Sequence, residues 1–215
     1  MKKMLYSLML SDDVVREIDL LAHRAGTNRS NFINQILAEY VNLTTPEKRA
    51  NDIFRAIEDL TRPTSELIPF FAPNNLTMSL KSCLQYKYRP TLKYEVALLS
   101  GYGSSIGELS VVFRTRSAEL IADMENFFRI WKTAEDMYLT THGLETRDYA
   151  LYNNKLTRSI ASPQKSVTSE ALAEAISGYI ELFDSSVKAY LSEQCGAEDI
   201  AAAYKNFADR SAILI

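Results

Sequence analysis

The sequence lacks any long hydrophobic run. No stretch of its 215 residues approaches the ~18 consecutive apolar residues of a membrane span, and the opening MKKMLYSLMLSDD meets acidic residues too soon for a signal peptide. Cysteine is scarce as well: Cys83 and Cys195 lie far apart and belong to no CxxC or Cys/His cluster, which excludes a disulfide framework and a zinc site. We therefore expect a folded protein that stays in the cytoplasm without membrane contact.

Histidine is nearly absent, which argues against an enzyme. His23 and His142 have no carboxylate or thiol neighbour at metal-ligand or catalytic-triad spacing. The paired acids at 135–136 and 198–199 fall on expected helix surfaces, where solvation explains them. The glycines at 101, 103 and 107 do not form a phosphate loop, because a strand follows them and no Lys-Ser/Thr closes the segment. We expect no catalysis, no metal and no cofactor.

A basic excess is also lacking. The chain holds 24 Lys and Arg against 27 Asp and Glu, a net charge of -3, whereas a protein bound to nucleic acid mainly by electrostatics is strongly basic. Residues 1–45 carry equal numbers of basic and acidic side chains. Any DNA contact must therefore be local, and its specificity must come from the placement of a few residues.

What the chain does have is an ordered N-terminal pattern. Residues 3–10 are too short for a stable lone helix and end at Ser11-Asp12-Asp13, a good helix N-cap, so they are expected to form a strand. A first helix follows to Gly26, and Thr27 or Asn28 caps a second helix. The apolar stripe of that second helix is too wide for one short neighbour to cover. One strand and two short helices cannot make their own core, so a second copy is the natural cover.

These residues carry a family resemblance. The junction Leu10-Ser11-Asp12-Asp13-Val14, the turn at Gly26, the start of the second helix at 29–33 and Tyr40 near its end resemble the ribbon-helix-helix family of the Arc, MetJ and CopG repressors. The resemblance covers about a fifth of the chain. It implies an intertwined homodimer or higher oligomer whose two-stranded ribbon enters the major groove of double-stranded DNA, while the second helices contact phosphates.

The resemblance also implies roles for single residues. In the ribbon, the residues that would read bases are Lys3, Leu5, Ser7 and Met9, and the inward set includes Met4. The residues that would contact phosphates are Thr27, Asn28, Arg29 and Ser30. The dimer core would hold Tyr6, Leu8, Leu10, Ile18, Ile33 and Leu37. Leu5 and Met9 depart from the polar or basic readers usual in the family, which weakens direct base readout.

The rest of the chain is expected to be a connecting helix and loop at 46–77, then an α+β domain at 78–215. Helices are expected at 46–60, 117–139, 166–193 and 197–210, and strands at 78–89, 92–99 and 108–116. The predicted fold class is therefore α+β: a ribbon-helix-helix dimer module followed by a mainly helical domain with a small antiparallel three-stranded sheet. The domain would serve oligomerisation, a protein partner or a small ligand.

One basic group in the domain has two interpretations. It consists of Lys81, Lys87, Arg89, Lys93, Arg114 and Arg116, set among Tyr86, Tyr88 and Tyr94. The group is either a contact for nucleic acid or an acidic ligand, or the solvated face of a sheet that helices cover on its other side, and we favour the second interpretation.

Three functions remain open. The leading hypothesis is a bacterial-type, sequence-specific DNA-binding transcriptional regulator that acts as a repressor. A plasmid segregation adaptor that binds centromere repeats is the second, and an antitoxin, whose tail is usually short and disordered, is the third. A module that only dimerises, without DNA binding, is the alternative to all three.

Overall fold

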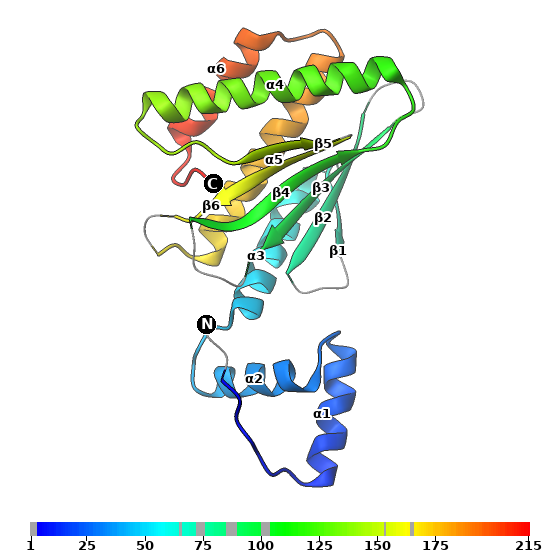
Figure 1. Ribbon diagram of the computed structural model, residues 1–215, viewed down its shortest axis with the longest axis vertical. Helices are drawn as coiled ribbons and strands as arrows, with labels where there is room; N and C mark the ends of the chain where they lie inside the picture. The colour runs from blue at the N-terminus through cyan, green and yellow to red at the C-terminus, as the bar shows by residue number, and fades with distance from the viewer. Residues whose placement is uncertain are drawn as a thin grey trace.

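The computed structural model describes residues 4–64, 66–71, 76–84, 90–99, 104–152, 154–163 and 166–215. Figure 1 shows a pair of helices at the N-terminal end and a larger α+β domain above them. The pair consists of α1 (Asp12–Arg24) and α2 (Arg29–Tyr40). The other helices are α3 (Pro46–Thr61), α4 (Ala118–Thr141), α5 (Ser169–Leu191) and α6 (Ala197–Arg210), with a 3-10 turn, η1, at Arg62–Thr64.

One antiparallel sheet of six strands forms the centre of the domain. The strands are β1 (Ile68–Phe71), β2 (Thr77–Cys83), β3 (Thr91–Leu98), β4 (Ser105–Phe113), β5 (Tyr149–Tyr152) and β6 (Lys155–Ala161). Their order across the sheet is β1-β2-β3-β4-β6-β5. The expectation of a three-stranded sheet is wrong, because β1, β5 and β6 extend it on both sides. The sequence pattern of each of these strands is weak. Strand β1 contains Pro69, which a sheet tolerates only at an edge, and β5 has only four residues. Strand β6 carries a charged residue, Arg158, on its buried face.

The expected N-terminal ribbon is also absent. Residues 4–11 form neither strand nor helix, and the first regular element is α1. A β-strand exists only where a neighbouring strand exchanges backbone hydrogen bonds with it, and none of the described strands pairs with this segment. The apolar alternation of residues 4–10 is therefore not enough to make a strand within one chain. The two helices that were expected after the segment are confirmed.

Helices cover one face of the sheet. Alternate strand residues such as Tyr94, Val96, Val111 and Phe113 are fully buried, and Tyr94 meets Phe183 of α5 at a ring distance of 6.0 Å. On the same face Phe113 lies 5.9 Å from a phenylalanine of α4. Helix α3, from the segment expected only to connect two units, adds its buried apolar residues to this core. Period-two burial in the strands and amphipathic helices thus build one continuous core.

A charged network lies inside that core. Arg158 of β6 donates two hydrogen bonds to Glu135 of α4, at 3.0 and 2.6 Å, and both side chains are almost completely buried. The hydroxyls of Tyr204 and Tyr179 donate to the same carboxylate at 2.8 and 3.2 Å. Burial alone lowers the pKa of Arg158, but the adjacent Glu135 carboxylate more than compensates and raises it. The network ties β6 to α4, α5 and α6 and keeps both charges satisfied.

Within the described residues, no helix has the length and apolar character needed to cross a membrane.

Candidate nucleic-acid interface

The candidate site is the N-terminal module, defined as residues 4–43. Its first helix begins after Ser11 with two acids in the first turn, Asp12 and Asp13, which suit the positive end of the helix dipole. The turn between the helices contains Gly26, whose φ of 64° is the left-handed conformation that glycine adopts without strain. The module is therefore a helical hairpin with well-formed local signals at each end.

The beginning of α2 is suited to an anion. The Asn28 side chain caps the helix, because its Oδ1 accepts a hydrogen bond from the Asn31 backbone N–H at 2.9 Å. The first turn holds no acidic residue, so the partial positive charge of the helix end is not compensated there. Asn28, Arg29 and Ser30 are exposed and Thr27 is half-buried. These are the four residues for which phosphate contact is expected, and the structure places them together.

Arg29 already has a partner in the single chain. Its Nε and Nη2 donate to the two carboxylate oxygens of Asp19 in α1, at 2.6 and 2.5 Å. The hydrogen bond from Arg29 lowers the pKa of Asp19, and the same bond raises the pKa of Arg29. This bidentate pair holds α2 against α1. Arg29 thus has a positioning role within the hairpin in addition to any phosphate contact.

Large apolar side chains cover the surface of the module. Fourteen of the twenty-one exposed large hydrophobic residues among the described residues fall in this short module. Helix α1 buries only Ala22, and α2 buries no residue completely. A monomeric soluble protein rarely exposes a contiguous apolar patch larger than a few hundred Å². The module therefore presents a surface that is suited to burial against another molecule.

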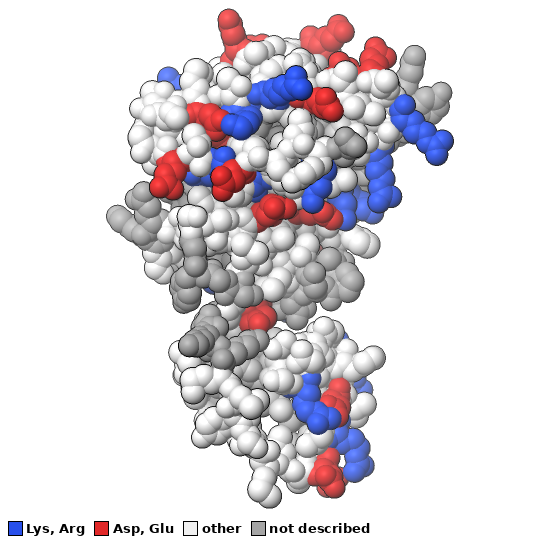
Figure 2. Space-filling view, in the orientation of Figure 1, with Lys and Arg blue, Asp and Glu red and all other residues white. Residues whose placement is uncertain are grey.

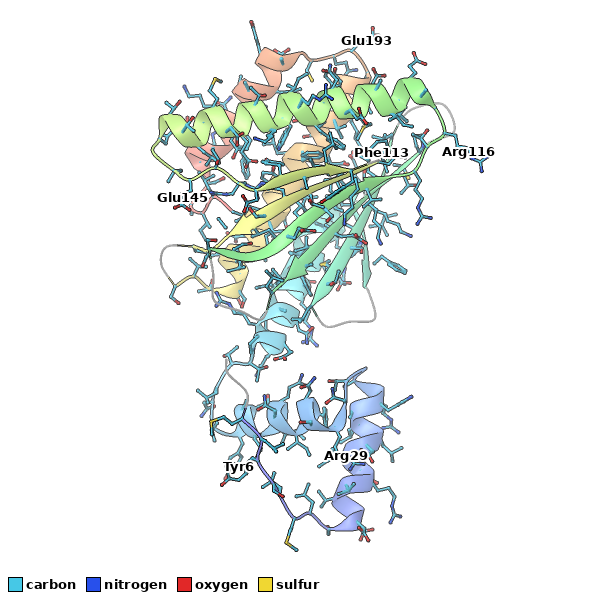
Figure 3. All side chains as sticks on the ribbon, viewed as in Figure 1. Tyr6, Arg29, Phe113, Arg116, Glu145 and Glu193 are labelled. Carbon is cyan, nitrogen blue, oxygen red and sulfur yellow. The ribbon has the colours of Figure 1, made fainter. Side chains whose placement is uncertain are left out.

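Residues 4–10, the expected reading segment, are the most exposed part of this surface. Leu5 and Met9 are fully exposed and Ser7 is also exposed, whereas Leu8 and Leu10 are 54% and 42% exposed. The inward positions Met4 and Tyr6, however, are both 83% exposed, so exposure does not separate the expected outward and inward sets, and that assignment stays a prediction. In Figure 3 the labelled Tyr6 projects away from both helices. Lys3 lies outside the described residues.

The residues expected in a dimer core lie on the two helices and on this segment. Ile18 of α1 and Ile33 of α2 are half-buried in the hairpin, while Leu37 is 52% exposed and Tyr6 83% exposed. The hairpin therefore covers the first two partly by itself, and the other two have little cover within the chain. Their role in a dimer stays a prediction.

The basic group of the domain is only partly brought together. Lys81 and Lys93 lie directly opposite each other on β2 and β3, on the sheet face away from the helices. Tyr94 is not part of that surface: it is fully buried on the covered face, donates to Asp184 at 2.8 Å, and burial followed by the Asp184 charge raises its pKa. Residues 85–89, 101 and 103 lie outside the described residues, so Tyr86, Lys87, Tyr88, Arg89, Gly101 and Gly103 are not placed.

Sequence reasoning missed two residues of the same face, Tyr152 and Lys155. They are cross-strand partners on β5 and β6. The signal that could have revealed them is the Asn153-Asn154 dipeptide between two short β-prone segments, since two-residue hairpin turns favour asparagine. Asn154 does adopt a positive φ, of 58°.

The described residues hold no cluster of three or more His, Cys, Asp or Glu side chains that could bind a metal ion. His23 is exposed on α1. The Nδ1 atom of His142 is 2.8 Å from the carbonyl oxygen of Tyr138, and the two rings stack 4.1 Å apart. Cys83 and Cys195 are free thiols. The exposed helical hairpin with its apolar surface remains the candidate site.

Comparison with known proteins finds no family model, curated protein or solved structure that matches the chain.

Proposed function

We propose that the chain is a sequence-specific DNA-binding transcriptional regulator of the bacterial type, which acts in the cytoplasm as a homodimer and represses the genes it binds. The observation that carries the proposal is the uncovered apolar surface of the N-terminal module. A standard protein interface buries about 800 Å² per partner, and fourteen large hydrophobic side chains supply an area of that order. A second copy of the module covers this surface with matching residues.

DNA contact follows from the rest of the module. The first turn of α2 is exposed and has no acidic residue of its own, so it is suited to a phosphate that competes with Asp19 for Arg29, and Asn28 keeps that helix end formed. Residues 5, 7 and 9 would contact base edges, with methyl groups of Leu5 and Met9 meeting thymine methyl groups and the Ser7 hydroxyl forming a hydrogen bond. Because residues 1–45 carry no net charge, specificity comes from this placement and not from bulk electrostatics.

Assembly is tested by the mass of the full-length protein in light scattering. Leu8→Lys places a charge in the apolar surface, so we expect the dissociation constant of the dimer to rise at least tenfold. Met137→Lys is the matched control, because Met137 is an exposed methionine of α4 outside the module. A wild-type protein that remains monomeric at high concentration, or a Leu8→Lys variant with unchanged mass, contradicts the proposed dimer.

DNA binding is tested by enrichment of fragments from a random duplex pool. Ser30→Asp is the sharpest variant: a carboxylate in the first turn of α2 favours the helix dipole but repels a phosphate. We expect unchanged dimer mass and at least a tenfold loss of affinity for the enriched site. Ala118→Asp, at the first position of α4, adds the same charge to another helix start as the control. If no sequence is enriched while the dimer is present, the module serves assembly only.

A further inference from the structure

A row of residues crosses the face of the sheet that the described helices leave open. Residues paired across adjacent strands place one side chain of each strand in this row, which we call the lysine row: Ile68, Lys81, Lys93, Val112, Lys155 and Tyr152. Their alternation with buried neighbours puts all six on the same face. With strands ~4.8 Å apart, the row is about 24 Å long.

Charge is concentrated in this row. Lys81 and Lys93 are directly opposite each other, an arrangement of like charges that destabilises a sheet. Among the residues that the structure describes, Lys93 is the one lysine of the three with a carboxylate partner, Glu95 at 2.5 Å. Arg114 and Arg116 follow the end of β4, and Figure 3 shows Arg116 projecting outward there. Figure 2 shows Lys and Arg side chains gathered on this side of the domain, beside a smaller group of acids. An anionic ligand would relieve the repulsion.

Exposed aromatic rings flank the lysines on the same face. Tyr152, 65% exposed, ends the row beside Lys155. Phe70, 55% exposed, lies at the other edge of the sheet, where the Lys81 ammonium sits 4.7 Å from its ring centroid. Ring faces at both ends and cations between them are the arrangement on which unpaired bases stack while phosphates meet lysines. The bases of a duplex are already stacked and paired, so the exposed rings favour a single strand.

We propose that the lysine row binds single-stranded nucleic acid, with Lys81, Lys93 and Lys155 on phosphates and Phe70 and Tyr152 stacked on bases. A stacked strand carries one phosphate per ~3.4 Å, so a row of about 24 Å accommodates at most about seven nucleotides, within the ~4–16 that one OB-fold, a different domain that binds single strands, accommodates. This surface is separate from the N-terminal module, and its activity does not depend on the proposed regulation.

The experiment measures fluorescence anisotropy of a labelled dT12 oligonucleotide with the full-length protein. The variant Lys81→Gln/Lys93→Gln/Lys155→Gln is expected to bind at least tenfold more weakly, and the slope of log affinity against log salt should fall by about two, since each lost phosphate contact removes ~0.7. The control variant Arg55→Gln/Arg129→Gln/Lys205→Gln removes three exposed cations from α3, α4 and α6 and should bind within twofold of wild type.

Stacking is tested by Tyr152→Ala, which should weaken dT12 binding about tenfold. Tyr152→Phe keeps the ring and should bind dT12 as tightly as wild type. Unchanged binding by the triple lysine variant overturns the proposal. A second result also overturns it: a 12-base-pair duplex or polyglutamate binds as tightly as dT12, and Tyr152→Ala has no effect on dT12 binding. The surface would then attract any polyanion. Ser30→Asp should leave dT12 binding unchanged, so failure of the N-terminal proposal and failure of this one are distinguishable.

Discussion

The two regions of the molecule differ in where their apolar residues go. The domain formed by residues 46–215 buries large aromatic and aliphatic side chains between one sheet face and four helices, whereas the module of residues 4–43 leaves most of its large apolar side chains exposed. Both regions contain helices with side-chain N-caps, Asn28 in the module and Ser117 and Thr168 in the domain. The difference teaches that local helix signals say nothing about whether a segment has a core of its own, because burial needs a second layer.

The largest expected effect on stability comes from truncating one large apolar side chain in the domain, in comparison with one in the module. Phe127→Ala removes a fully buried ring that contacts four other aromatic rings, and it should lower the free energy of unfolding by about 3–5 kcal/mol. Leu37→Ala in the module should change it by less than ~0.5 kcal/mol. The measurement is urea unfolding followed by Trp131, the one tryptophan, which lies in the domain core. Similar losses for the two variants would mean that the regions unfold together.

A second contrast concerns the ion pairs. Arg158→Met leaves the buried Glu135 carboxylate without its cation, so we expect a loss of about 3–5 kcal/mol. Adding Glu135→Leu should recover much of it, because the uncompensated charge is then gone. Arg29→Met breaks an exposed pair in the module and should leave the Trp131 unfolding midpoint unchanged. If the double variant is no more stable than Arg158→Met alone, the loss of stability comes from the disrupted geometry of the network and not from the unpaired charge.

The smallest effect is a titration in the module. Hydrogen bonds from Arg29 lower the Asp19 pKa below its ordinary value of 3.8. A depressed folded-state pKa contributes stability above the unfolded-state value and loses it as pH falls through the folded-state value, so the hairpin should loosen only in acid. Carboxyl carbon NMR should show a midpoint below 3.8 that returns to the ordinary value in Arg29→Gln. High salt should reduce the shift, because the pair is exposed. If Arg29→Gln leaves the Asp19 midpoint unchanged, the ion pair with Arg29 is not the cause of the lowered Asp19 pKa.

Sequence reasoning found the helices well and the sheet poorly. Helices α4, α5 and α6 show apolar residues at three- and four-residue spacing, with Ser117 and Thr168 as caps of the first two, and they lie within a few residues of the expected ranges. The short strands β1 and β5 offer too few residues for an alternation, and Arg158 interrupts that of β6. For the candidate site, sequence placed the four residues at the start of α2 but not the Arg29–Asp19 pair, which depends on how two helices cross.

The sequence by itself determined where helices begin and end and which face of each is apolar, because caps and periodicity act over a few neighbouring residues. Only the tertiary structure decided which strands pair, and therefore that Lys81, Lys93 and Lys155 share one row although up to 74 positions separate them in the chain. It also decided that residues 4–10 remain unpaired in the single chain. Strand pairing is a long-range choice made by backbone hydrogen bonds and burial, and no local pattern encodes the partner.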